Sequence, residues 1–208
     1  MTLTHFAIIA VCAYLLGSLS FAIIVSKLTL GKDIRNYGSG NAGLTNAYRT
    51  MGAKKTLLVL LGDIAKGAAA VSIGMVLAGP VGKLTAGIFV ILGHMFPLYF
   101  GFKGGKGVLV AGGAILAIQP ILIPFLFLIF LACLLPTGMV SLGSITMAVL
   151  YPVLTLIYSY YRGLAAGDMA VCFVGALIMS ILVIYMHRSN IKRIREGKEY
   201  RFGKKHQK

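Results

Sequence analysis

The amino-acid sequence predicts an all-α polytopic membrane protein with about seven transmembrane helices. Of its 208 residues, 58% are hydrophobic, and the mean hydropathy is +0.89. Only 12% are charged, about half the share that is usual in soluble domains. Long, continuous apolar runs recur along the chain, whereas the strands of a membrane barrel alternate apolar and polar residues. The bilayer is therefore the solvent that accounts for this composition, and the spanning elements are helices.

The apolar runs define the predicted elements in order. A spanning helix needs roughly 20 mostly apolar residues, and Gln119-Pro120 divides one long run into two passes, the first of them short. We expect a single integral membrane domain over residues 1–208, with polar motif loops at 26–55, 101–107 and 187–208. The sequence leaves open whether residues 26–37 form a surface helix or a loop. The predicted helices cover approximately residues 3–25, 56–78, 84–100, 108–118, 120–135, 140–160 and 169–186.

The charged residues predict how the chain is oriented. There are 20 Lys and Arg against 5 Asp and Glu, a net charge of +15. With seven crossings, nearly all the cations fall on one face, and the opposite face keeps only Lys83 and Arg162. By the positive-inside rule the loaded face is cytoplasmic, so the N-terminus lies outside and the C-terminus inside. Because position explains the basic residues, we do not expect nucleic-acid binding.

Several chemistries lack the residues they need. Two-metal catalysis needs clustered carboxylates, but the five acidic residues are scattered along the chain. An H-x-x-x-x-D acid–base pair and a G-x-S-x-G nucleophile elbow are both absent. The cysteines Cys12, Cys133 and Cys172 lie in apolar runs without a C-x-x-C pair, so they predict packing rather than zinc or a disulfide. We expect neither a metal nor a cofactor.

The first polar motif, residues 38–49, has the composition of a phosphate-binding loop. It contains G-x-G-x-x-G, but no strand precedes it, so the match to a dinucleotide fingerprint is accidental. Glycines let a ligand approach main-chain N–H groups, and an arginine side chain suits phosphate. The alternative is a solvated cytoplasmic loop. The candidate binding residues are Ser39, Gly40, Asn41, Thr45, Asn46 and Arg49.

The second motif, residues 93–108, contains a run that resembles a phosphate loop without matching Walker A, because Gly follows the lysine. We expect its glycines to expose N–H groups beside a cation and a helix N-terminus, which together favour an anion. Nearby aromatic residues border an acyl chain or form an interfacial belt. His94 alone is more typical of a structural histidine. The candidate binding residues are Gly104, Gly105, Lys106 and Gly107.

The third motif, residues 187–199, follows the last predicted helix. If it is helical, His187 and Asn190 are neighbours on one face. The alternative is a basic tail attracted to anionic lipid. Within the bilayer, Asp63 and Lys66 are spaced i, i+3, about 10 Å from the cytoplasmic end of their helix. They form a structural pair or a proton relay.

Taken together, residues 38–46, 93–108 and 187–199 closely resemble the three motifs of the bacterial acyl-phosphate:glycerol-3-phosphate acyltransferase family (PlsY). The resemblance implies a seven-helix inner-membrane enzyme that moves a fatty acyl group from acyl phosphate to the sn-1 hydroxyl of glycerol 3-phosphate. The implied products are lysophosphatidic acid and phosphate, for phospholipid synthesis. The implied partners are both substrates, membrane lipid and the enzyme that supplies acyl phosphate.

The resemblance also implies roles for residues of the three motifs. Ser39, Lys106, His187 and Asn190 are the expected catalytic residues. Arg193 and Glu199 join the residues already named in substrate binding, and Met186 departs from the family, where a basic residue often precedes the histidine. Two other functions stay open: a small membrane transporter of phosphate esters, in which the same loops bind without reaction, and a non-catalytic lipid-binding scaffold.

Overall fold

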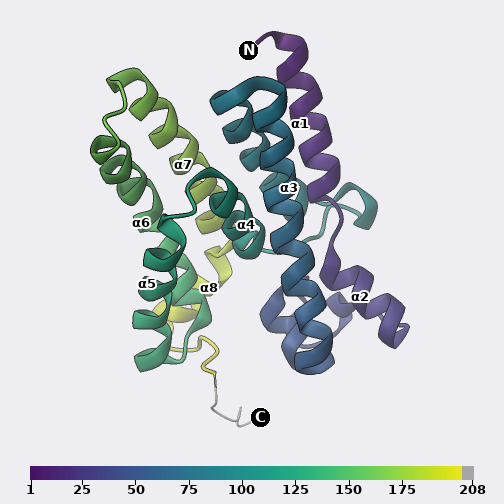
Figure 1. Ribbon diagram of the computed structural model, residues 1–208. Coiled ribbons are helices and arrows are strands. Elements are labelled where there is room, and N and C mark those ends of the chain that lie inside the picture. Colours follow the sequence, from purple (N-terminus) through teal and green to yellow (C-terminus); the bar gives the residue numbers. More distant parts are fainter. Residues whose placement is uncertain (203–208) are drawn as a thin grey trace. The chain divides into compact units, whose positions relative to one another are not determined.

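The computed structural model describes residues 1–202, and over this range every regular element is helical. This confirms the predicted fold class. The helices pack into two compact units, residues 1–120 (unit 1) and residues 121 onward (unit 2), and Figure 1 labels their helices along the chain. The single integral membrane domain expected over residues 1–208 stays a prediction.

Unit 1 is built around one long, interrupted helix. Its elements are α1 (Leu3–Gly17), α2 (Phe21–Leu30), the 3-10 helix η1 (Ile34–Asn36), α3 (Leu44–Met95), the 3-10 helix η2 (Leu98–Phe100) and α4 (Val108–Ile118). Helix α3 has non-helical backbone angles at Gly52 and again at Ala78 and Gly79. The second interruption folds α3 back on itself, so that a Cβ atom on Gly74 would lie 2.7 Å from the Cβ of Ala86. The predicted helices 56–78 and 84–100 correspond to the two sides of this fold.

The first predicted helix, 3–25, is divided in the structure. The Tyr14 carbonyl accepts both the N–H and the hydroxyl of Ser18, at 2.9 and 2.8 Å, and α2 begins afresh at Phe21. Residues 26–55, expected as a loop, are helical up to Leu30 and again from Leu44. Residues 26–37 comprise the last turn of α2, a left-handed glycine at Gly31 and η1.

Unit 2 contains α5 (Leu122–Thr137), α6 (Val140–Tyr161), α7 (Ala166–Met186) and α8 (Arg188–Arg195). The predicted helices 120–135, 140–160 and 169–186 overlap α5, α6 and α7. The third motif, expected as a loop, is largely helical as α8. The chain beyond α8 returns to the turn between α5 and α6, where the Phe202 N–H donates to the Gly138 carbonyl at 2.7 Å.

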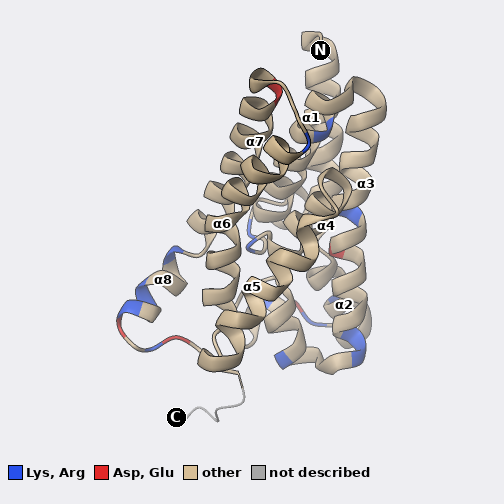
Figure 2. Cartoon of the chain, turned by 60° about the vertical axis from the view of Figure 1, so that its left-hand side comes forward, with Lys and Arg blue, Asp and Glu red and all other residues tan. Residues whose placement is uncertain are grey.

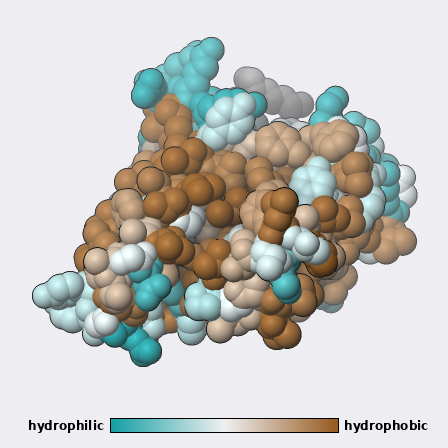
Figure 3. Space-filling model, turned by 90° about the horizontal axis from the view of Figure 1, so that it is seen from above, coloured by the Kyte–Doolittle hydropathy of each residue, from teal (hydrophilic) through white to brown (hydrophobic). Residues whose placement is uncertain are grey.

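Within residues 1–202, four helical stretches are long and apolar enough to cross a membrane: Leu3–Leu30, Leu44–Phe100, Val140–Tyr161 and Ala166–Met186. Helices α4 and α5 are apolar but shorter. Many large apolar side chains are exposed, among them Val76 at 85% and Leu135 at 77%, and apolar residues cover much of the face shown in Figure 3. In unit 1, Lys and Arg gather from the end of α2, through the segment that follows it, to the start of α3 (Figure 2). Seven crossings and the orientation stay predictions.

The contact between α3 and α4 generates a test with a built-in control. A Cβ atom at Gly113 would overlap the carbonyl oxygen of Ile64 and lie 2.9 Å from its Cα, whereas a Cβ at Gly112 meets nothing within 4 Å. We therefore expect Gly113→Ala to lower the free energy of unfolding by about 1–3 kcal/mol, through overpacking. Gly112→Ala is expected to leave it unchanged or raise it by about 0.5–1 kcal/mol, because alanine favours the helix. Reversible unfolding in mixed micelles measures both, and equal values would contradict this packing.

Candidate active site

The first motif folds around the side-chain amide of Asn46, which is 2% exposed. Its Oδ1 accepts the N–H of Ser39 at 2.9 Å. Its Nδ2 donates to the carbonyls of Ile34, Tyr37 and Asn41 at 3.2, 3.0 and 3.0 Å. The sequence predicts Asn46 as a substrate donor, but these bonds commit its amide to the loop itself. Asn46 therefore acts by holding the loop in shape.

The polar groups that the loop presents are different ones. Ser39 and Gly40 are exposed, and Gly38 and Gly40 have φ values of 60° and 71°, a left-handed conformation that favours glycine. The Oδ1 atom of Asn41 is buried and has no hydrogen-bond partner among the described residues. Thr45 and Arg49 lie one turn apart on α3, so they share a face.

Arg35 connects the first motif to the second. Its guanidinium donates to the carbonyls of Phe100 and Lys103 at 2.6 and 3.1 Å. The same group donates to both carboxylate oxygens of Asp33, at 3.0 and 2.8 Å. The hydrogen bond from Arg35 is the main cause that lowers the pKa of Asp33 below its ordinary value. The sequence shows Arg35 only as one of many loop cations; the signal missed is D-x-R, in which Asp33 caps η1 by accepting the Arg35 N–H.

The glycines of the second motif permit close approach rather than expose donors. The N–H groups of Gly104 and Gly105 donate to the carbonyls of Met95 and His94, at 3.1 and 3.2 Å, so these two are not exposed as expected. A Cβ at Gly105 would overlap the ring of His94 and lie 2.6 Å from the carbonyl oxygen of Ala42. The second motif therefore packs directly against the first.

Gly107 starts α4 in a left-handed conformation, with φ of 79°. This places Lys106, which is half-buried, immediately before a helix N-terminus, where the helix dipole favours anions.

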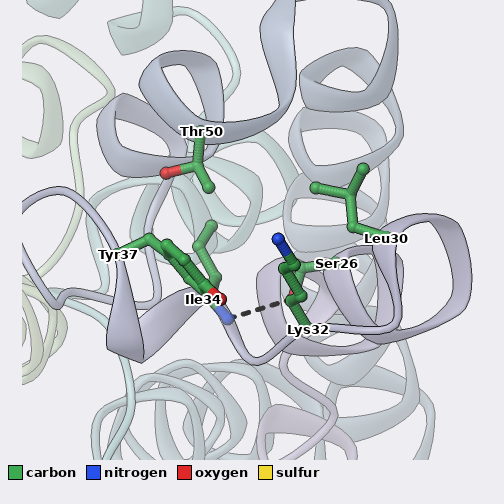
Figure 4. A pocket seen from close by; sticks show the side chains of 6 residues that line it. All are labelled: Ser26, Leu30, Lys32, Ile34, Tyr37 and Thr50. Carbon is green, nitrogen blue, oxygen red and sulfur yellow. Dashed lines mark hydrogen bonds between the residues drawn. The ribbon is translucent and has the colours of Figure 1, made fainter.

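Two cavities lie beside these motifs. One, of 520 Å³, is lined from both motifs and carries two cations and several glycines. The other, of 270 Å³, is formed by α2, η1 and α3 (Figure 4), and in it the Ser26 hydroxyl accepts the Ile34 N–H at 3.2 Å. The larger cavity is the better suited to an anionic group, because the carboxylate of Asp33 is already bonded to Arg35. Its lining residues are Asp33, Arg35, Asn36, Gly40, Phe100, Gly101, Lys103 and Gly104.

The third motif lies wholly within unit 2, and His187 is the residue that joins α7 to α8. The His187 ring is 2% exposed, and its Nδ1 lies 2.8 Å from the Val183 carbonyl. A carbonyl can only accept, so Nδ1 carries a hydrogen, and the lone pair of the neutral ring is on Nε2. His187 is the N-cap of α8, and Asn190 lies in the first turn of this helix; that the two side chains are neighbours on one face stays a prediction.

Glu199 organises the rest of the third motif. It accepts hydrogen bonds from Ser141, Asn190 and Arg193, at 2.7, 2.6 and 2.7 Å. Arg193 and Glu199, expected among the substrate contacts, therefore bond to each other. Asn190 keeps its Oδ1 buried without a hydrogen-bond partner among the described residues. Within residues 1–202, no three His, Cys, Asp or Glu side chains are grouped so as to hold a metal ion.

These features define an integral membrane protein of helical fold that carries glycine-rich, basic motifs built to receive anions. Residues 7–197 match the family model described as glycerol-3-phosphate acyltransferase, and the chain belongs to this family. It is 42% identical over 188 residues to the glycerol-3-phosphate acyltransferase of Bacillus subtilis (strain 168), covering 90% of this chain and 93% of that one. It is 42% identical over 193 residues to that of Syntrophomonas wolfei, covering 93% and 95%.

Two solved structures share the fold. Both are crystal structures of PlsY (YgiH), an integral membrane glycerol 3-phosphate acyltransferase. The glycerol 3-phosphate form superposes with a TM-score of 0.84 at 38% identity, covering 95% of this chain and 96% of that one. The lysophosphatidic acid form gives 0.82 at 36% identity, covering 95% of each. The resemblance to this family that the three motifs indicate is thereby confirmed.

The Glu199 carboxylate predicts a pH-dependent stability. Burial, the largest single influence, raises its pKa, but the hydrogen bonds from Ser141, Asn190 and Arg193 and the charge of Arg193 together lower it. A depressed pKa gives stability that is present above the ordinary glutamate value of about 4.3 and is lost as the pH falls through the folded value. Glu199→Gln should lower the free energy of unfolding by about 1.5–3 kcal/mol at neutral pH. It should also make this free energy depend less on pH in the acid range.

Glu196→Gln is the matched control for this measurement. Glu196 is paired with Lys192 and Lys198 at the surface, at 4.0 and 3.6 Å, where such pairs contribute less than about 1 kcal/mol. The free energy of unfolding, measured from pH 7 down to about pH 3, separates the two variants. If both profiles match that of the unsubstituted protein, Glu199 does not hold the third motif.

Proposed function

We propose that this protein transfers a fatty acyl group from acyl phosphate to the sn-1 hydroxyl of glycerol 3-phosphate, giving 1-acylglycerol 3-phosphate and inorganic phosphate. The observation that carries the proposal is the direct packing of the two glycine-rich motifs at Gly105 and Ala42. It brings two anion-receptive loops together, and the reaction has two phosphate-bearing substrates. Membership of the family supports the acceptor, as do relatives solved in glycerol 3-phosphate and lysophosphatidic acid forms.

The chemistry needs little beyond anion binding and orientation. The hydroxyl oxygen attacks the acyl carbon, an acyl C–O bond forms, and the C–O bond to the phosphate breaks. Acyl phosphate is an activated mixed anhydride, so neutralising the departing phosphate and fixing the hydroxyl supply much of the catalysis. The proton of the hydroxyl goes to His187 or to a phosphate oxygen of the substrate. No covalent acyl-enzyme is required.

The residues divide between the two tasks. Ser39, Arg49 and Lys106 hold phosphate groups, and Gly40, Thr45 and Gly107 shape the surfaces on which these groups rest. His187 and Asn190 orient the glycerol hydroxyl. Two facts support the second assignment: the Asn190 Oδ1 is buried without a hydrogen-bond partner among the described residues, and the hydrogen on Nδ1 of His187 leaves Nε2 as the acceptor.

We further propose that the enzyme lies in the bacterial inner membrane with its active site on the cytoplasmic side. The support is the gathering of Lys and Arg from the end of α2 to the start of α3 within unit 1 and on α8 within unit 2 (Figure 2). The positive-inside rule assigns such segments to the cytoplasm. Cysteine labelling of the two ends of the chain in intact cells tests it: a label that reaches the C-terminus from outside would reverse the orientation.

The decisive experiment mixes purified protein with palmitoyl phosphate and glycerol 3-phosphate and follows phosphate release and the acylated product. We expect release that depends on both substrates, with the acyl group at sn-1. Movement of glycerol 3-phosphate into liposomes without release would indicate a transporter instead. Tight lipid binding with neither outcome would indicate a scaffold. Acyl-CoA and acyl carrier protein substituted for acyl phosphate test the donor, and activity only with one of these would overturn it.

The proposed phosphate ligands give a direct prediction. Arg49→Ala and Lys106→Ala should each raise the KM for a phosphate substrate by about 10- to 100-fold, because a hydrogen bond to a charged group contributes about 1.5–3 kcal/mol. Lys54→Ala removes one surface cation at an exposed residue of α3 and is the control. Its KM should stay within about two-fold of that of the unsubstituted protein. Initial-rate kinetics for both substrates give the result, and an unchanged KM in either variant removes that residue from phosphate binding.

His187→Ala separates the two destinations of the proton. If the imidazole accepts it, kcat should fall by about 10²–10⁴-fold, which is the range of general base catalysis. If a substrate phosphate oxygen accepts it, the loss should be confined to the smaller effect of a misoriented hydroxyl. The unfolding temperature is the control, because His187 is buried at the junction of α7 and α8.

A further inference from the structure

Three ionisable side chains form a buried cluster in unit 1. Lys66, Asp63 and His94 are 3%, 1% and 3% exposed, and all three lie on α3, where His94 comes from the segment after the fold at Gly79. The Lys66 Nζ lies 2.8 Å from Asp63 Oδ1, 2.6 Å from the Leu19 carbonyl and 3.0 Å from His94 Nδ1. The ammonium is thus held by one ion pair three residues away on the same helix and by two hydrogen-bond partners that are remote in sequence.

This geometry fixes the His94 ring. An ammonium can only donate, so Nδ1 accepts and the hydrogen of the neutral ring is on Nε2. The opposite edge of the ring faces the second motif, because a Cβ at Gly105 would overlap Nε2. His94 therefore lies between the buried Lys66 and the backbone that precedes Lys106.

The main chain strengthens this connection. The Gly105 N–H donates to the carbonyl of His94, and the Gly104 N–H donates to that of Met95. Gly105 also lies against the Ala42 carbonyl of the first motif, where a Cβ would come within 2.6 Å. Any displacement of His94 must therefore move the loop that carries Lys106, relative to the first motif.

We propose that Asp63, Lys66 and His94 are positioning residues, which hold the Gly104–Gly107 loop and Lys106 in the arrangement that binds substrate phosphate. This inference rests on the proposed function only through the role of Lys106. It favours the structural pair over the proton relay, since an ion pair and two hydrogen bonds tie Lys66 to three neighbouring groups. The cluster acts on the substrate through the loop and does not touch it.

The test compares two substitutions of His94. His94→Asn keeps an acceptor oxygen near the position of Nδ1, whereas His94→Leu has no acceptor for Lys66. For the substrate whose KM is raised by Lys106→Ala, His94→Leu should raise KM at least ten-fold, and His94→Asn should restore most of the affinity. Thr85→Val is the matched control, because it removes a buried hydroxyl that donates to the Val81 carbonyl within the same segment of α3; the KM of this variant should not change.

A double-mutant cycle shows whether the effect passes through the loop. In the Lys106→Ala background, His94→Leu should change KM by less than about two-fold, because the cation being positioned is already gone. Asp63→Leu combined with Lys66→Met removes both buried charges at once and provides a second variant if a single substitution does not fold. It should also raise KM.

A purely structural role gives a different pattern. The unfolding temperature and the fraction of active protein would fall, kcat referred to total protein would fall, and KM would stay constant; this result overturns the proposal, as does full additivity with Lys106→Ala. Titration of inorganic phosphate and glycerol 3-phosphate into the same proteins gives affinities without turnover. If the unsubstituted protein releases no phosphate, the acyltransferase proposal fails, while unchanged affinities in the His94→Leu protein would defeat the positioning proposal separately.

Discussion

The ammonium of Lys66 is the constraint on which the arrangement of unit 1 depends. A charge removed from water inside an apolar bundle is costly unless it is paired and fully hydrogen-bonded. It forms an ion pair with the Asp63 carboxylate and hydrogen bonds with the Leu19 carbonyl and the His94 ring. A carbonyl inside a continuous helix would bond to its own helix, so the interruption between α1 and α2 is what leaves Leu19 available to Lys66. The break between α1 and α2 supplies an acceptor for the buried lysine, and the lysine satisfies a carbonyl that the break leaves without a helical partner.

From this cluster the order extends to both glycine-rich motifs. The His94 ring packs against Gly105, and Gly105 packs against Ala42 of the first motif. Arg35 connects the turn at Asp33 to the carbonyls of Phe100 and Lys103. Small residues allow the same close approach between helices, since a Cβ on Gly67 would lie 3.0 Å from the Ala114 nitrogen. That contact sets α4 against α3, and α4 begins at the residue after Gly107. The backbone that carries Lys106, the residue proposed to bind phosphate, is thus supported from the bundle interior as well as from the loop.

Features that depend on local sequence were predictable, and those that depend on contacts between remote residues were not. Apolar runs gave the helical fold class, and the spacing of Asp63 and Lys66 gave their pairing, because residues three apart on a helix are neighbours. His94, 28 residues from Lys66, was expected to be structural, but its partner could not be read from the chain. Arg35 reaches carbonyls 65 and 68 residues away, and no local pattern distinguishes it from the other loop cations.

For a related reason, residues that were expected to donate N–H groups to a ligand form hydrogen bonds within the protein instead. Asn46 and the glycines at 104 and 105 were expected to offer N–H groups to a ligand, because their residue types suit that role. A loop must first satisfy its own buried polar groups, and these residues do so. What is left for a ligand is what the internal network does not use, such as the Oδ1 atoms of Asn41 and Asn190. Composition identifies a motif, but only the complete hydrogen-bond pattern separates the groups that build it from those that it presents.

The few carboxylates are distributed so that the motifs stay positive. Asp33, Asp63 and Glu199 are each paired with a named cation, at 2.8, 2.8 and 2.7 Å, and Glu196 lies near two lysines. Asp168 lies in the first turn of α7, where the helix dipole favours a negative charge. Five carboxylates so placed cannot offset 20 cations. The resulting field attracts anionic substrates to both motif-bearing units, while the paired carboxylates organise the loops without repelling the phosphates that those loops are proposed to bind.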